Sequence, residues 1–184
     1  DINSKLTSVL TDVETNLLSW TNEKSQIYKV NADSGKDTEI SEELSGYLER
    51  LLKIAKDSDG AFDPTIGKLI RLWDIGGENQ RIPGEDEIQE VLKDSGYQKN
   101  SLDGNTIHMD EGCSLDLGAA GKGIGCDLIL ENLKNQKDVT AALMNLGGSS
   151  VMTYGSKPDG SSWNVAVTDP RAENDDDYLG VVAL

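Results

Sequence analysis

A glycine-rich segment at residues 114–127, SLDLGAAGKGIGCD, has the clearest capacity for chemistry. Residues 114–117 have strand character, a predicted turn with Lys122 follows, and a helix is then expected to about residue 134. Glycine has no Cβ, so backbone N–H groups in such a turn can approach phosphate oxygens closely, and the lysine ammonium adds a positive charge. The segment therefore indicates a site for a ligand that carries phosphate.

The spacing of this segment differs from that of two familiar phosphate-binding motifs. A P-loop needs a glycine five residues before the Gly121-Lys122 pair and a Ser or Thr after it, where Asp116 and Gly123 stand. Glycines 121, 123 and 125 also lack the GxGxxG spacing of dinucleotide-binding folds. A plain strand-to-helix connection with Lys122 in solvent is the simpler alternative, and the pattern alone leaves both open.

The composition limits the kinds of partner that the chain can bind. It carries 17 Lys and Arg against 33 Asp and Glu, a net charge of −16, which repels nucleic acid and anionic membrane surfaces. A nucleotide site would therefore need compensation from backbone amides, Lys122 or a divalent metal. The two cysteines, Cys113 and Cys126, predict small packed thiols rather than a disulfide framework or a metal motif.

Helical spacing of apolar residues dominates the first half of the chain. It predicts a long amphipathic helix from Ile2 to Trp20, and a second helix that Ser41 caps. Asp63 followed by Pro64 is typical of an N-cap and the first residue of another helix. A short strand is possible at residues 26–30.

Strand patterns follow from residue 97 onwards. Strands are expected at residues 97–102, 106–109, 114–117, 141–146, 150–154, 163–168 and 179–184, with 141–146 buried. Residues 103–105, Asp-Gly-Asn, predict a hairpin turn. The expected fold class is α+β: helices first, then a mainly antiparallel sheet with one helix embedded after the glycine-rich turn.

Five sequence blocks stand in one order along the chain. They are GAFDPT at residues 60–65, Trp73, LDLGA at 115–119 with Lys122-Gly123, NLGG at 145–148, and Trp163 with Asp169-Pro170. Each block alone has a simpler explanation, since the first could merely cap a helix and the fourth could be a corner. Together, over nearly the whole chain, they resemble the ApbE family, the FAD:protein FMN transferases.

The resemblance implies an α+β protein that binds FAD and a divalent metal, usually Mg²⁺. Such enzymes move FMN from FAD to a Thr or Ser hydroxyl of a target flavoprotein subunit, as in Rnf- and Nqr-type redox complexes, and release AMP. Most act outside the cytoplasm, often as lipoproteins, so contact with a membrane is expected only through a lipid anchor that has been removed. A FAD pyrophosphatase that yields FMN and AMP, a flavin-binding protein without catalysis, and an acidic interaction domain are the alternatives.

The resemblance also assigns site residues. Six positions correspond to residues that contact FAD, namely Trp20, Ala61, Phe62, Asp63, Asp116 and Lys122. Lys122 would lie near the pyrophosphate, and Trp20 stands where relatives often have a tyrosine beside the flavin ring, on which an aromatic side chain would stack. Ala119 corresponds to a position whose backbone carbonyl binds the metal. No catalytic side chain is assigned, because the nucleophile belongs to the acceptor.

The resemblance further predicts one ApbE-like domain over residues 1–184 that is incomplete. The family's opening Met-Gly-Thr strand is absent before Asp1, and its later motifs, including the Asp and Thr that complete the metal site, would lie beyond Leu184. We therefore expect this polypeptide alone to be inactive, and to bind FAD weakly or not at all.

Overall fold

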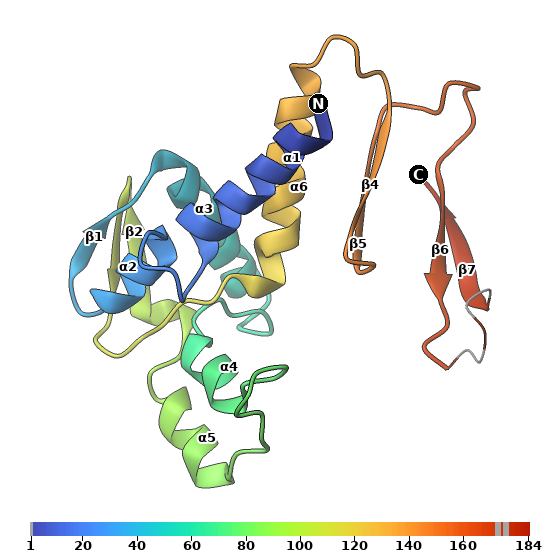
Figure 1. The fold of residues 1–184 in the computed structure, drawn as a ribbon. Coiled ribbons are helices and arrows are strands. Elements are labelled where there is room, and N and C mark those ends of the chain that lie inside the picture. The colour runs from blue at the N-terminus through green and yellow to red at the C-terminus, as the bar shows by residue number, and fades with distance from the viewer. Residues whose placement is uncertain (1, 172–173, 175–176) are drawn as a thin grey trace. The chain divides into compact units, whose positions relative to one another are not determined.

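The computed structural model describes residues 2–171, 174 and 177–184. Contacts divide the chain into two compact units, one of residues 3–121 and one of residues 122–184 together with Ile2. Helices dominate the first half, although a strand at residues 37–39 interrupts them, and the strands within each described sheet pair antiparallel (Figure 1), which confirms the α+β class. The expectation of one incomplete domain stays a prediction.

The first helical region is interrupted. Helix α1 (Ile2–Asp12) continues into a π-helical segment at Val13–Leu18, and the chain becomes extended at Ser19, so the predicted helix stops short of Trp20. Helix α2 (Gln26–Ala32) occupies the residues predicted as a possible strand, and that prediction is wrong. Ile27 and Val30 are both buried, and their spacing of three residues is helical rather than alternating.

Helix α3 (Glu42–Asp57) forms as predicted and supplies much of the core of residues 3–121. The Ser41 hydroxyl accepts a hydrogen bond from the amide of Leu44 at 3.1 Å, the geometry of an N-cap. The buried face of α3 comprises Leu44, Tyr47, Leu48, Leu51 and Ala55. This stripe recurs every three to four residues, so one face of the helix leaves water.

The sheet of this unit joins distant parts of the sequence. Strands β1 (Asp37–Glu39), β3 (Thr106–Met109) and β2 (Asn100–Asp103) lie in the order β1-β3-β2. The predicted hairpin turn is confirmed, since Gly104 has a φ of 54° and Asp103 pairs with Thr106. Residues 97–99, predicted as strand, form a 3₁₀ turn, because the amide of Tyr97 donates to Asp63 instead of to a strand.

Two short helices follow the GAFDPT segment. Helices α4 (Gly67–Trp73) and α5 (Glu85–Leu92) form, but the prediction that Asp63 and Pro64 open a helix is wrong. The Asp63 carboxylate accepts from the amide of Thr65 at 2.8 Å, which makes a local turn. Ile66 then pairs with Ser114 in a parallel bridge, so the helix begins only at Gly67.

The strand predicted at residues 114–117 is not formed beyond that single bridge. Leu115 finds its partner in a side chain: its amide donates to Asn31 Oδ1 at 2.7 Å, and Asn31 Nδ2 donates to its carbonyl at 2.9 Å. Leu115 is fully buried, so both backbone groups need a partner. Asn31 therefore holds this segment in place of a neighbouring strand.

Helix α6 (Gly118–Lys134) begins inside the glycine-rich segment, so the predicted glycine-rich turn is wrong. Glycines 118, 121, 123 and 125 lie in the helix, and none of them has a positive φ. The Asp116 carboxylate accepts from the amide of Gly118 at 2.7 Å, which makes a local turn just before the helix. Each glycine costs a helix about 1 kcal/mol relative to alanine, and burial of Ile129 and Leu133 further along offsets part of this cost.

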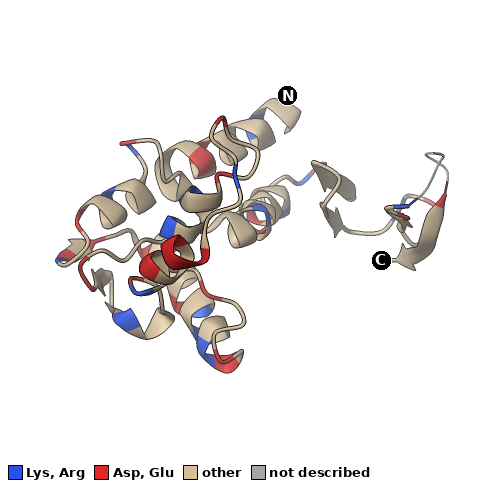
Figure 2. Ribbon diagram, turned by 90° about the horizontal axis from the view of Figure 1, so that it is seen from below, with Lys and Arg blue, Asp and Glu red and all other residues tan. Residues whose placement is uncertain are grey.

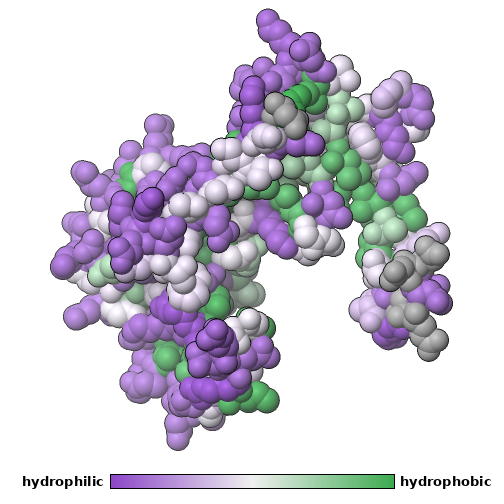
Figure 3. All heavy atoms as spheres, viewed as in Figure 1, coloured by the Kyte–Doolittle hydropathy of each residue, from purple (hydrophilic) through white to green (hydrophobic). Residues whose placement is uncertain are grey.

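Two hairpins occupy the rest of residues 122–184. Strands β4 (Ala142–Leu146) and β5 (Ser150–Tyr154) form one, and β6 (Asn164–Thr168) and β7 (Tyr178–Ala183) form the other. The expectation that residues 141–146 are buried is wrong, because the side chains of β4 alternate between half-buried and exposed. Leu179 and Val181 of β7 remain 62% and 53% exposed, since a two-stranded hairpin covers little of its own surface. Figure 3 shows apolar residues at the surface of this hairpin.

No helix among the residues described has the length and apolar character that crossing a bilayer requires.

We expect Asn31→Ala to lower the free energy of unfolding by about 1–3 kcal/mol, because it leaves two buried backbone groups of Leu115 without partners. Asn31→Asp keeps an acceptor for the Leu115 amide, so its free energy of unfolding should lie between those of the Asn31→Ala variant and the unaltered protein. Urea denaturation measures the effect. Asn135→Ala is the matched control, since that amide bonds Glu131 in solvent at 2.9 Å and its loss should cost at most about 0.5 kcal/mol. Equal losses at the two asparagines would contradict the assignment.

Candidate functional site

Lys122 and the NLGG block meet within residues 122–184. Lys122 lies near the start of α6, and its ammonium donates to the Ser149 hydroxyl at the β4–β5 turn. A Cβ built on Gly147 would lie 3.7 Å from the Lys122 nitrogen. Gly147 and Gly148 have φ values of 66° and 75°, a backbone conformation that strains other residues. Two motifs separated in the sequence therefore form one feature.

This feature suits an anionic group. The ammonium of Lys122 supplies positive charge, Ser149 supplies a hydroxyl donor, and the glycines leave the backbone open to a close approach. Lys122 is exposed, so the charge is available to a ligand from solvent.

Asp63 has its carboxylate engaged within its own loop. One oxygen accepts from the amide and hydroxyl of Thr65 at 2.8 and 2.6 Å, and the other accepts from the amide of Tyr97 at 2.9 Å. The neighbouring Ala61 is exposed and Phe62 is half-buried. Asp63 thus fixes a loop whose accessible groups are the two residues before it.

The Asp63 loop lies directly beside the segment that carries Asp116. The amide of Asp116 donates to the carbonyl of Pro64 at 2.9 Å, and the amide of Gly67 donates to Ser114 at 2.9 Å. A Cβ on Gly67 would come within 2.8 Å of the Ser114 carbonyl oxygen, so only glycine permits this approach. Asp116 itself is half-buried, with one oxygen on Gly118.

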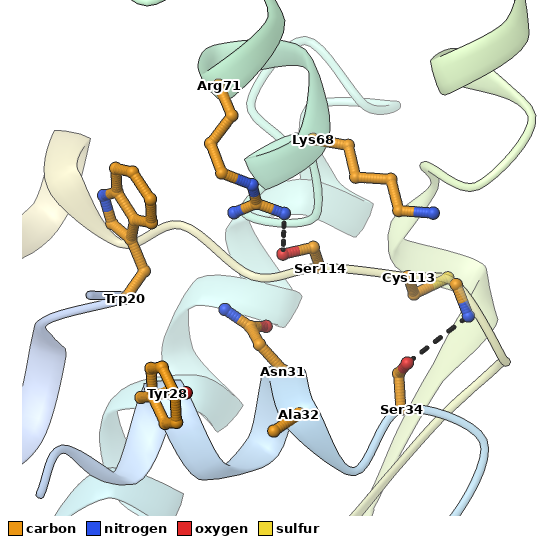
Figure 4. A pocket seen from close by; sticks show the side chains of 10 residues that line it. Trp20, Tyr28, Asn31, Ala32, Ser34, Lys68, Arg71, Cys113 and Ser114 are labelled. Carbon is orange, nitrogen blue, oxygen red and sulfur yellow. Dashed lines mark hydrogen bonds between the residues drawn. The ribbon is translucent and has the colours of Figure 1, made fainter. Parts of the chain in front are cut away.

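Arg71 of α4 links this segment to Trp20 (Figure 4). Its Nη2 donates to Ser114 Oγ at 2.7 Å, and its guanidinium carbon lies 5.4 Å from the centre of the Trp20 ring. Burial lowers the pKa of Arg71, and the charge of the nearby Asp116 opposes that shift. The structure therefore brings Trp20 and Asp116 to the same arginine.

Sequence reasoning missed Arg71, and no local signal could have found it. Arginine in an amphipathic helix usually lies on the solvated face. Its role follows only from the position of Ser114, 43 residues further along the chain.

A cavity of about 470 Å³ opens beside Arg71. Its lining comprises Trp20, Tyr28, Asn31, Ala32, Ser34, Lys68, Arg71, Gly112, Cys113 and Ser114. Two of these residues are basic and none is acidic, in a chain whose Asp and Glu are spread over helices and loops (Figure 2). Lys68 is paired with Asp94 at 2.5 Å, whereas Arg71 bonds a neutral hydroxyl and an aromatic ring.

The described residues do not form a metal site of their own. Among them, no group of three His, Cys, Asp or Glu side chains is placed to hold an ion. Ala119 is exposed in the first turn of α6, where a regular helix directs its carbonyl towards the amide of Gly123. Its metal role stays a prediction.

The fold is that of an α+β protein. Its candidate site residues include Lys122 beside the glycine turn at residues 147–148, and Trp20 in contact with Arg71. The ApbE family model matches residues 2–184, and the chain belongs to the ApbE family. The resemblance inferred from the five sequence blocks is thereby confirmed.

Individual relatives agree with this placement. The FAD:protein FMN transferase of Treponema pallidum is 30% identical over 171 residues, with 84% of this chain and 47% of that protein covered. The protein of the same name from Haemophilus influenzae is 26% identical over 191 residues, with 100% and 52% covered. The chain thus spans about half the length of the curated relatives it matches.

Solved structures show the same fold. The ApbE protein of Thermotoga maritima matches with a TM-score of 0.87 at 30% identity, covering 100% of this chain and 59% of that one. The apo form of the flavinyl transferase ApbE from Pseudomonas stutzeri matches with a TM-score of 0.83 at 26% identity, covering 100% and 56%.

We expect Asp63→Ala to lower the free energy of unfolding by about 1–3 kcal/mol, because the buried Thr65 and the amide of Tyr97 lose their acceptor. Thermal unfolding measures the loss. Asp159→Ala is a matched control, since Asp159 makes the same pair of bonds to Ser161, at 2.9 and 2.7 Å, in an exposed loop. A change no larger at Asp63 than at Asp159 would show that the carboxylate does not hold the loop.

Proposed function

We propose that this protein acts as a metal-dependent FAD:protein FMN transferase. It would move FMN from FAD to a Thr or Ser hydroxyl of a flavoprotein subunit and release AMP. The family match over residues 2–184 supports the class of reaction, and relatives from two organisms carry that name. The observation that carries the proposal is the convergence of Lys122 on the Gly147–Ser149 turn, because it offers a diphosphate a cation in an acidic chain.

In this reaction the protein mainly has to position the substrates and neutralise negative charge. The acceptor oxygen attacks the phosphorus of the FMN half, the bond to the bridging oxygen breaks, and AMP leaves with that electron pair. The hydroxyl proton passes to a base. Negative charge on the transferred group needs neutralisation in the transition state, and Lys122 supplies part of it. Mg²⁺, when bound, would supply more, with the Ala119 carbonyl as the ligand assigned in this chain.

The flavin end of the substrate would use the other group of residues. Trp20 offers a ring for stacking on the isoalloxazine, and Ala61 and Phe62 offer the accessible part of the loop that Asp63 fixes. Asp116 lies beside this loop, with one carboxylate oxygen on the amide of Gly118, and is the third element of this group.

The acceptor and the location of the protein are part of the same proposal. A subunit of an Rnf- or Nqr-type redox complex is the proposed acceptor, and an extracytoplasmic lipoprotein is the proposed form of the enzyme. A FAD pyrophosphatase would use the same residues with water as the nucleophile, so only the product distinguishes the two activities.

We expect a mass increase equal to FMN on the acceptor when the full-length protein is incubated with FAD, Mg²⁺ and a candidate subunit. Intact mass spectrometry of the acceptor and chromatography of the nucleotides measure the result. Release of FMN and AMP without modification of the acceptor would identify a pyrophosphatase. Bound FAD that stays whole would identify a flavin-binding protein, and no interaction with FAD would favour an acidic interaction domain.

We expect Lys122→Ala to raise the FAD concentration needed for half-maximal transfer about tenfold, because a charged contact to phosphate is lost. Steady-state kinetics with FAD as the varied substrate measure the change. Lys134→Ala is the control on the same helix, since Lys134 pairs with Glu131 at 2.7 Å away from the β4–β5 turn. Identical kinetics for the Lys122 variant and the unaltered protein would exclude the assigned role.

A further inference from the structure

We propose that Arg71 is a positioning residue of the flavin site, which sets the orientation of the Trp20 ring. The inference rests on the proposed function, because it takes Trp20 as the ring beside the flavin. It adds a residue that neither the sequence blocks nor the family resemblance assigns.

Arg71 contacts both the exposed ring of Trp20 and the buried Ser114. Trp20 follows the extended residue Ser19 and is 39% exposed, so packing covers only part of its side chain. Arg71 comes from helix α4 and is anchored on Ser114, which is 3% exposed. Gly67, at the start of the same helix, donates to the carbonyl of Ser114. The guanidinium that contacts Trp20 is therefore fixed by a buried part of the chain.

The contact between the Arg71 guanidinium and the Trp20 ring is of a kind that orients the ring as well as packing against it. A guanidinium at 5.4 Å from the ring centre is within the range of a cation–π attraction, which favours the ring face over the edge. With the guanidinium over one face, a flat ligand would stack on the opposite face of Trp20. Arg71 would thereby set which face of the ring a ligand meets and at what tilt.

Charge connects this pair to the rest of the site. Asp116 acts on Arg71 electrostatically, and the Asp116 backbone bonds the Asp63 loop through Pro64. Lys68, the other cation of the cavity, is committed to Asp94. Arg71 is therefore the basic group that relates the aromatic ring to the predicted FAD contacts of residues 3–121.

Lysine cannot replace Arg71 in this role. Its ammonium is a compact point charge that cannot lie flat on an indole while it also donates to Ser114. Arg71→Lys keeps the charge and removes the planar geometry, whereas Arg71→Met keeps most of the length and removes both. The two variants separate orientation from simple attraction.

The first experiment observes Trp20 directly. In a Trp73→Phe, Trp163→Phe background Trp20 is the one remaining tryptophan, and acrylamide quenching of its fluorescence reports ring access. We expect both Arg71→Met and Arg71→Lys to increase the quenching constant by about half or more. Arg50→Met is the matched control, because Arg50 lies 5.0 Å from the centre of the Tyr47 ring on α3. Unchanged quenching in both Arg71 variants overturns the inference.

The second experiment is a double-mutant cycle on FAD binding, followed by flavin fluorescence. We expect Arg71→Met and Trp20→Ala each to raise the dissociation constant of FAD about threefold to tenfold. Arg71→Met added to Trp20→Ala should then have no further effect, because the arginine acts through the ring. Multiplicative effects would show that Arg71 acts independently of Trp20 and would overturn the inference.

The outcomes separate this inference from the proposed function. If Trp20→Ala leaves FAD binding unchanged while FMN transfer to the acceptor proceeds, the inference falls and the proposed function stands. If the unaltered full-length protein neither binds FAD nor transfers FMN, both fall. Circular dichroism and the melting temperature of each variant exclude unfolding as the cause of a loss.

Discussion

The two hydrogen bonds between the Asn31 side chain and the backbone of Leu115 hold the segment on which the site depends. They join positions 84 residues apart and satisfy a fully buried peptide group. With Leu115 fixed, Ser114 on one side contacts Gly67 and Arg71. Asp116 on the other side bonds the carbonyl of Pro64 and the amide of Gly118, at the start of α6. One amide side chain thus sets the geometry of the residues around it.

Sequence periodicity predicted the secondary structure correctly where local contacts determine it. It failed where a residue far away in the sequence determines which structure forms. The Ser41 cap and the apolar stripe of α3 are local signals, and the helix formed as predicted. Residues 26–30 are too short for periodicity to separate strand from helix, and burial of Ile27 and Val30 decided for helix. Residues 114–117 have strand character, but Leu115 pairs with a side chain, which no local pattern reveals.

The candidate site was predictable in its residue types and not in its assembly. The sequence indicated Lys122 and the NLGG block separately, but only the fold shows that the lysine reaches Ser149, 27 residues away. Asp63 was expected to contact FAD, and the structure shows its carboxylate bonded to Thr65 and Tyr97. An aspartate that holds its own loop and an aspartate that contacts a ligand look alike in a sequence motif, so the motif alone could not show which role Asp63 has. Family membership supports the proposed class of reaction, while the contacts show which side chains position others.

The glycines at the start of α6 have a consequence for how that helix responds to force or to a ligand. Backbone freedom regained on unwinding is greatest at glycine, so residues 118–123, with three glycines and no buried side chain, unwind at a lower cost than the rest. The far end carries Ile129 and Leu133, both buried, and resists fraying. The free-energy cost of unwinding α6 therefore rises along the helix, from the turn with Ala119 and Lys122 to the turns with Ile129 and Leu133. A peptide carbonyl near its beginning can turn outwards while the remaining turns stay wound.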